Sequence, residues 1–163
     1  MKIFEIAKFF GFSSKNEDLD KFLSAHDISE RPIFTESPIE LITRKEQGLS
    51  LWFETDDYYK ETYGPLHKEG GMILTTVQVY SEYHGSKFSR YLGTLPFGLQ
   101  FESTLEEAIT ILGQPRNSHR SGPLNQMYSW SNFQGYQVSL SFLPEGKKIA
   151  LLSLSPKEIY GNN

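Results

Sequence analysis

The sequence predicts an α+β fold of two similar units, each a helical segment followed by an antiparallel β-meander, with the helices packed on one face of the sheet. Three observations support this: capped segments with apolar residues at helical spacing, runs in which apolar and polar residues alternate, and the same order of elements in both halves. We expect residues 1–93 to form the first unit, with an extra N-terminal helix, and residues 94–163 the second, within one compact domain.

The clearest helix signal is the segment ESTLEEAITILGQP in the second unit. Two overlapping pairs, Ser103 with Glu106 and Thr104 with Glu107, have the spacing of a capping box. In such a box a hydroxyl and a carboxylate satisfy the free N–H groups of the first turn. An apolar stripe at helical spacing and a Gly-x-Pro stop follow, so we expect a short helix that ends at this glycine.

Strand patterns follow that helix in the second unit. The run YQVSLSF alternates apolar and polar residues, as is typical of a strand with one buried and one exposed face. The runs QMYSW before it and IALLSLS after it complete a three-stranded meander. The polar stretch RNSHRSGPLN, which separates the helix from these runs, is expected to be a loop.

The first unit shows the same order of elements. Apolar residues at helical spacing in NEDLDKFLSAHDISERP predict a helix, and PIELITRKEQGLSLWFE predicts a hairpin that turns at Gly48. In the last run, MILTTVQVY, we expect Ile73, Thr75, Val77 and Val79 to face the same way. The pattern of one helix and three strands therefore occurs once in each half.

Composition and charge restrict the possible partners. The chain has no cysteine, so disulfides, thiolate metal ligands and cysteine nucleophiles are excluded. Residues 1–93 contain 11 Lys and Arg against 15 Asp and Glu, whereas residues 94–163 contain five of each class. An acidic first half disfavours nucleic acid and suits a basic protein partner. Because we find neither a membrane-spanning apolar stretch nor an export signal, we expect a cytoplasmic protein without membrane association.

Motifs that carry catalysis are missing from the sequence. There is no phosphate-binding P-loop, no nucleophile elbow and no histidine pair with zinc-ligand spacing, so we expect no catalytic residue, no cofactor and no metal ion. The enzymatic alternative is a small hydrolase or nucleotide-binding enzyme that uses His119 with Arg116 and Arg120. These three residues share one polar stretch.

The most distinctive segment is residues 54–71, ETDDYYKETYGPLHKEGG, which we expect to be a long loop between two strands. Tyrosine supplies rigid contact area and carboxylates bind arginine, so their combination suits protein recognition. The alternative is a solvated loop whose charges keep the chain soluble. A divalent cation at Asp56 and Asp57 is disfavoured, because the EF-hand spacing is missing. The candidate partner-binding residues are Glu54, Asp56, Asp57, Tyr58, Tyr59, Glu61 and Tyr63.

A loose motif in the second unit joins a glycine, a capped helix, a Leu-Gly-x-Pro stop and a Tyr-x-Trp run before a closing hairpin. Its residues are Gly98, Ser103, Glu106, Glu107, Leu112, Gly113, Pro115, Tyr128 and Trp130. With them the unit resembles the repeat of the β-lactamase inhibitor protein and the small lipoprotein of the outer-membrane β-barrel assembly machine. The resemblance implies a tandem helix-plus-sheet fold. The lipidated cysteine of the lipoprotein and the disulfides of the secreted inhibitor have no counterpart here.

In size, acidic charge and expected fold, the chain is also similar to the immunity proteins of bacterial toxin systems, including contact-dependent growth inhibition. This resemblance implies a non-enzymatic protein that binds and blocks a cognate toxin domain, such as a basic nuclease, through its acidic aromatic surface. The alternative is an adaptor or assembly factor that binds proteins but has no toxin partner.

Overall fold

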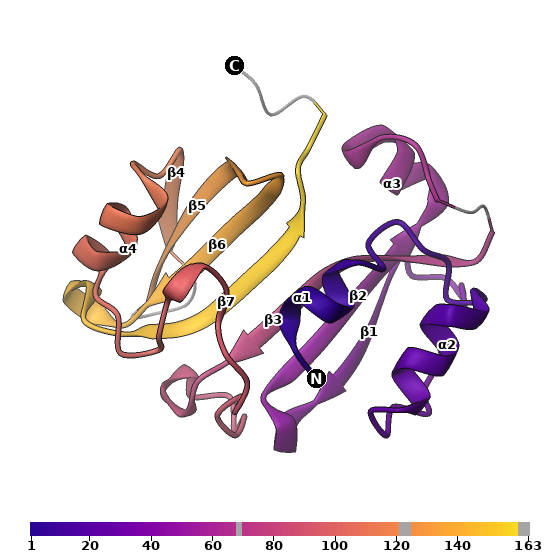
Figure 1. Cartoon of the computed structure of the whole chain (residues 1–163), viewed down its shortest axis with the longest axis horizontal. Coiled ribbons are helices and arrows are strands. Elements are labelled where there is room, and N and C mark those ends of the chain that lie inside the picture. Colours follow the sequence, from indigo (N-terminus) through magenta and orange to yellow (C-terminus); the bar gives the residue numbers. More distant parts are fainter. Residues whose placement is uncertain (68–69, 121–124, 160–163) are drawn as a thin grey trace.

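The computed structural model describes residues 1–67, 70–120 and 125–159, which fold around one seven-stranded antiparallel sheet (Figure 1). The strand order is β1-β2-β3-β7-β6-β5-β4, so each half forms a meander and the two meanders meet where β3 pairs with β7. The strands are β1 (Ile39–Arg44), β2 (Leu49–Thr55), β3 (Met72–Tyr80), β4 (Asn117–Arg120), β5 (Gln126–Phe133), β6 (Tyr136–Phe142) and β7 (Ile149–Pro156).

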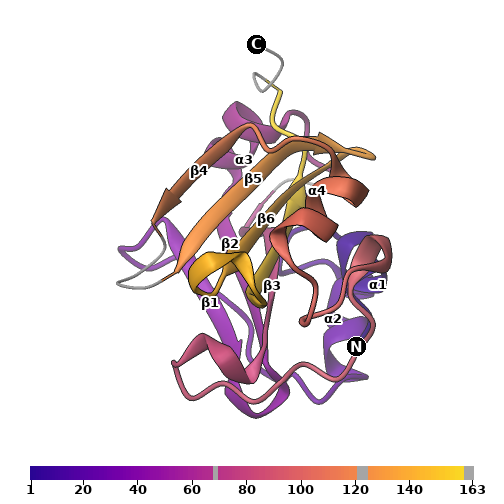
Figure 2. The ribbon, with the colours of Figure 1, turned by 90° about the vertical axis from the view of Figure 1, so that its left-hand side faces the viewer.

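Four α-helices accompany the sheet in the described part of the chain. They are α1 (Ile3–Ala7), α2 (Glu17–Ser24), α3 (Asp56–Tyr63) and α4 (Leu105–Leu112). Helices α1, α2 and α4 lie on the same side of the sheet, whereas α3 stands at the end of β2 and β3 (Figures 1 and 2). The α+β class is therefore confirmed, but α3 departs from the expectation that the helices cover one face.

One row of apolar side chains crosses six strands on the helix-covered face. From β1 through β5 along the sheet order, the row consists of Ile42, Leu51, Val77, Leu154, Val138 and Trp130. Residues opposite one another in the ladder share a face, and all six are buried. They belong to one hydrophobic cluster with Ile6 of α1, Leu23 of α2 and Ala108 of α4. Both halves of the chain therefore share a single core.

The opposite face carries a polar row that crosses all seven strands. Along the sheet order it consists of Thr43, Ser50, Gln78, Ser153, Ser139, Ser129 and Asn117. Hydroxyl groups bond along this row: Ser50 Oγ donates to Thr43 Oγ1 at 3.3 Å, and the Oγ atoms of Ser129 and Ser139 lie 2.8 Å apart. Small polar side chains of this kind need no apolar cover, in agreement with the position of the three helices on the other face.

The helix predicted in the second unit is confirmed as α4. Thr104 Oγ1 accepts a hydrogen bond from the N–H of Glu107 at 3.2 Å, and the Glu107 carboxylate accepts one from the N–H of Thr104 at 2.8 Å. The helix ends at Gly113, whose φ of 85° favours glycine. The indole N–H of Trp130 donates to the Gly113 carbonyl at 2.8 Å, which ties the end of the helix to β5.

The expectation that four alternating residues of β3 share a face is wrong at Ile73 and Thr75. A β-bulge opposite Trp52 and Phe53 of β2 leaves Thr75 as an extra residue in β3 and shifts the alternation. Beyond the bulge Leu74, not Ile73, belongs to the main core. The other two residues of the expected set do face the core.

Two expected loops contain regular structure. The stretch 54–71 is not one long loop, because it ends β2 and then forms α3. Thr55 caps this helix, since its Oγ1 accepts a hydrogen bond from the N–H of Tyr58 at 3.4 Å, and acidic residues occupy the first turn. The polar stretch after α4 contains the edge strand β4, which pairs with β5. Residues 68–69 and 121–124 of these stretches lie outside the described residues.

Candidate protein-binding surface

Helix α3 presents four of the seven candidate residues to solvent. Asp57, Tyr58 and Glu61 are exposed, with Tyr58 45% accessible. Asp56 is half-exposed, and its carboxylate lies 3.9 Å from Lys60 Nζ. Positions three and four residues apart are neighbours on a helix, so Glu61 lies next to both Asp57 and Tyr58. We call Asp56, Asp57, Tyr58 and Glu61 the acidic face of α3.

The other three candidate residues lie inward. Tyr59 is only 5% accessible. Its hydroxyl packs so closely against Gly11 that a Cβ atom at this position would lie 2.7 Å from it. Tyr63 is half-buried, and burial together with the nearby charge of Glu54 raises its pKa. Glu54 itself is buried. These three side chains therefore hold α3 against the sheet and are not available to a partner in this conformation.

Glu54 is an unusual group in this interior. Burial raises the pKa of its carboxyl group, and the nearby side chain of Thr75 opposes that shift in part. Among the described residues, its Oε2 atom has no hydrogen-bond partner. The side chain of Ser155 in β7 partly opposes the rise in the pKa of the neighbouring Tyr63. The cluster thus links β2, α3 and β7 on the polar face of the sheet.

A groove of 610 Å³ opens beside the first turn of α3. Four segments form it: the chain between α2 and β1, the turn that precedes α2, the junction of β2 with α3, and the start of β3. The lining residues include Lys15, Pro32, Ile33, Phe34, Asp57 and Met72. Ile33 and Phe34 are 69% and 62% accessible, which is a large exposure for adjacent apolar residues.

Arg31 fixes one wall of this groove. Its Nε donates to Asp20 Oδ1 at 2.7 Å, and its two terminal nitrogens donate to the Ile28 carbonyl at 2.6 Å and to Ser24 Oγ at 2.8 Å. These bonds tie the chain before Pro32 to α2. The guanidinium charge is used within the chain, and the groove is formed before any partner binds.

The sequence interpretation did not identify Ile33 and Phe34. The available signal was a pair of apolar residues directly after Pro32, in a segment with neither helical nor alternating spacing. Apolar residues outside a periodic element cannot be assigned to a core from sequence, and their exposure becomes visible only once the chain path between α2 and β1 is known.

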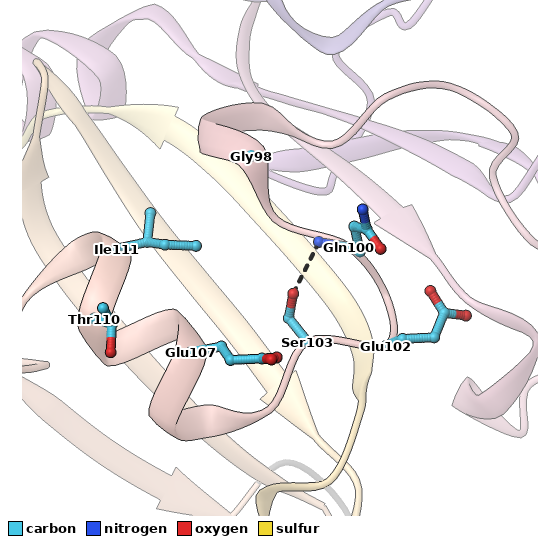
Figure 3. Close-up of a pocket in the computed structure, with 7 residues that line it drawn as sticks. All are labelled: Gly98, Gln100, Glu102, Ser103, Glu107, Thr110 and Ile111. Atoms are coloured by element: carbon cyan, nitrogen blue, oxygen red, sulfur yellow. Dashed lines mark hydrogen bonds between the residues drawn. The ribbon is translucent and has the colours of Figure 1, made fainter.

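A second pocket, of 470 Å³, lies where the chain leads into α4 (Figure 3). Its polar groups are already used within the chain. Ser103 Oγ accepts a hydrogen bond from the N–H of Gln100 at 3.1 Å, and Glu107 belongs to the capping box. The carboxylate of Glu102 receives hydrogen bonds from Arg90 at 2.6 and 3.0 Å, and these lower its pKa. We therefore assign structural roles to these residues.

The three residues of the enzymatic alternative, His119, Arg116 and Arg120, are not brought together as a catalytic site. His119 and Arg120 are exposed in β4, where adjacent positions point to opposite faces of the strand, and Arg116 precedes the strand. In residues 1–67, 70–120 and 125–159, no three His, Cys, Asp or Glu side chains are grouped so that they could hold a metal ion. Over the same residues, no helix has the length and apolar character needed to cross a membrane.

The fold and the surface thus define an α+β protein with one antiparallel sheet and an acidic helix beside an apolar groove. No family model matches the chain, and no curated protein sequence matches it. Among solved structures, it is similar to a DUF4309 family protein, YjgB, from Bacillus subtilis subsp. subtilis strain 168. That similarity covers 84% of this chain and 76% of the other, with 12% identity and a TM-score of 0.44. A similarity at this level shows neither a shared family nor a shared activity.

Proposed function

We propose that this protein binds and blocks a basic protein partner, as an immunity protein blocks its cognate toxin domain. The observation that carries the proposal is the acidic face of α3, where three carboxylates and the exposed ring of Tyr58 lie beside an apolar groove. An exposed apolar area rimmed by charge is typical of a surface that binds another protein.

The charges of this face suit a partner rich in lysine and arginine. Among the described residues, neither Asp57 nor Glu61 forms an ion pair, so both can meet cationic side chains of a partner. Opposite charge accelerates the encounter, and an aromatic anchor such as Tyr58 slows dissociation. For a nuclease, a basic nucleic-acid cleft would supply the complementary surface.

The proposal includes two similar units, residues 1–93 and 94–163. The strand order supports this division, because two duplicated meanders that meet at their last strands give the pairing of β3 with β7. It also includes a cytoplasmic location, where an immunity protein meets a toxin that has entered the cell.

A growth-protection assay tests the proposal. The product of the open reading frame next to this gene is tested as the candidate toxin: it is expressed alone or together with this protein, and we expect restored growth and a stable complex in the second case. The double variant Asp57→Lys, Glu61→Lys reverses charge on α3 and should weaken the complex about 100-fold, since several interfacial charge contacts are lost.

The matched control is Asp18→Lys, Glu106→Lys, which makes the same charge change at exposed positions in the first turns of α2 and α4. It should retain both binding and protection. If both double variants bind the partner equally well, α3 is not part of the interface. A complex without protection would replace the blocking role with that of an adaptor.

A further inference from the structure

We infer that the groove beside α3 takes a large apolar side chain followed directly by a lysine or arginine, both from one extended segment of the partner. This inference rests on the proposed function and specifies the chemistry of the bound segment. Two independent features carry it: an exposed apolar lining and an excess of negative charge at one wall of the same groove.

The apolar half of the site is formed by Ile33 and Phe34, with Pro32 and Met72 beside them. Met72 is fully buried, whereas Ile33 and Phe34 are largely exposed, so a ligand side chain can rest on a fixed surface and cover exposed apolar area. At 610 Å³, the groove is within the size range of sites that bind small ligands or single anchor side chains. Covering this apolar area provides the driving force for binding.

The charged half of the site is the wall formed by α3. Asp56 and Asp57 both line the groove. Among the described residues that line the groove, Lys15 and Arg31 are cationic. The hydrogen bonds of Arg31 to α2 and to the backbone occupy its guanidinium, and among these described residues Lys15 forms no ion pair with Asp57. Asp57 therefore remains for a cation from the partner, which would lie next to the apolar anchor. A carboxylate in that place in the partner would meet like charge.

The groove needs little rearrangement to accept such a segment. The hydrogen bonds of Arg31 fix one wall, and Gly71 closes the back wall. Gly71 has a φ of +77° and lies so close to the preceding turn that a Cβ atom there would be 2.9 Å from Ser13 Oγ. The N–H of Ser14 donates to the Met72 carbonyl at 2.7 Å and holds the same turn on β3. A preformed site loses less conformational entropy on binding, so a short segment can bind measurably.

Three matched peptides test the inference on the full chain. They are acetylated and amidated hexapeptides with the central pairs Phe-Arg, Phe-Glu and Ser-Arg, titrated into isotope-labelled protein and followed by NMR chemical shifts. We expect the Phe-Arg peptide to bind at least about tenfold more tightly than the other two, with shifts confined to the amides that surround the groove.

Two groove variants, each with a matched control, locate the site. Phe34→Ser and Asp57→Lys should each weaken the Phe-Arg peptide about tenfold. Leu92→Ser, at an apolar residue that is 92% accessible outside the groove, and Glu106→Lys, at the same helix position in α4 as Asp57 in α3, should leave binding unchanged. All four positions are solvent-exposed, so folding should be preserved.

Three outcomes would overturn the inference. Equal affinity for the three peptides, or shifts outside the groove, would show that it does not select this chemistry. A dimer that Phe34→Ser dissociates would assign the groove to a second copy of the chain. Toxin capture that survives Phe34→Ser but is lost on reversal of Asp57 and Glu61 would leave the proposed function standing without the groove. If the Phe-Arg peptide binds but the protein blocks no toxin, the peptide specificity of the groove stands and the proposed function is wrong.

Discussion

Each half of the sheet is an antiparallel meander, but the strands of the two halves are connected differently. In the second half, the short connection of residues 143–148 joins β6 to β7, the last two strands of that meander. In the first half, α3 and residues 64–71 separate β2 from β3, and a β-bulge lies near that end of the two strands. The ladder continues past the bulge up to the pair Thr55 and Met72, where the insertion begins. A meander can therefore carry an added helix at its end without losing its core.

Helices α3 and α4 show what this addition changes. Helix α4 buries Ala108 and Leu112 in the main core, has a reciprocal capping box and is bonded to Trp130 of β5. Helix α3 has the same length but buries only Tyr59 and presents its carboxylates to solvent. A helix with so little of its surface in the core leaves its carboxylates accessible, and this difference is the structural basis for proposing α3 as the binding surface.

The largest expected effect concerns the shared core. Trp130→Ala should lower the free energy of unfolding by about 3–5 kcal/mol, because a large buried ring and its bond to the Gly113 carbonyl are both lost. Urea denaturation followed by circular dichroism should show one transition, since residues of both halves form one cluster. Trp130→Phe keeps most of the apolar volume and should cost less. Two separate transitions would contradict a common core.

A local effect is expected at α3. Tyr59→Ala should cost about 2–3 kcal/mol and release the helix while the sheet stays folded, because Tyr59 is its one buried residue and an eight-residue helix is marginal in water. Hydrogen exchange measured by mass spectrometry should show faster exchange over residues 56–63 than in β6. Tyr58→Ala, at an exposed position of the same helix, should change stability by less than about 0.5 kcal/mol. Uniformly faster exchange would contradict local release.

The N-terminal caps of α3 and α4 also differ in strength. Thr104→Ala should destabilise by about 1 kcal/mol, because the capping box then loses the hydroxyl that accepts from Glu107. Thr55→Ala should cost less, since its bond to the N–H of Tyr58 is longer, at 3.4 Å, and has no reciprocal partner. Thermal unfolding of both variants checks the order. The reverse order would mean that α3 is held more firmly than its contacts indicate.

Sequence reasoning succeeded where one local signal decided the structure. The capping box at Thr104, the turn at Gly48 and the core-facing residues of β6 each depend on neighbours in the chain, and these predictions are confirmed. The expected exposed face of β6 is wrong at Ser141, which is buried. Sequence reasoning also failed at Thr75, where a bulge shifted the alternation, because a bulge depends on how β2 and β3 pair. Short polar segments such as β4 likewise become strands only through their partner.

The candidate surface was predicted only in part for a similar reason. Carboxylates and tyrosines between two strands indicated a binding segment, but its helical form determines which of them face outward. The periodicity of α3 turns Asp57 and Glu61 outward and Tyr59 inward, a distinction that a loop would not make. The contribution of Ile33 and Phe34 depends on the packing of distant segments around the groove.

The smallest expected effects distinguish two carboxylates whose pKa values shift in opposite directions. Burial raises the pKa of Glu54, so the folded protein holds this proton more tightly than the unfolded chain and loses stability as the pH rises from the ordinary glutamate pKa through the raised one. Glu54→Gln removes that loss and should gain stability over the wild type as the pH increases toward neutrality.

Glu102→Gln should behave in the opposite way. Hydrogen bonds from Arg90 lower the pKa of Glu102, so its contribution to stability is present at neutral pH and disappears as the pH falls through the lowered value. Urea titrations at pH 3, 5 and 7 should therefore show the gain of Glu54→Gln and the loss of Glu102→Gln growing together with pH. If the difference in unfolding free energy from the wild type changed with pH in the same direction for both variants, the polar face around Glu54 would admit enough water to solvate its charge.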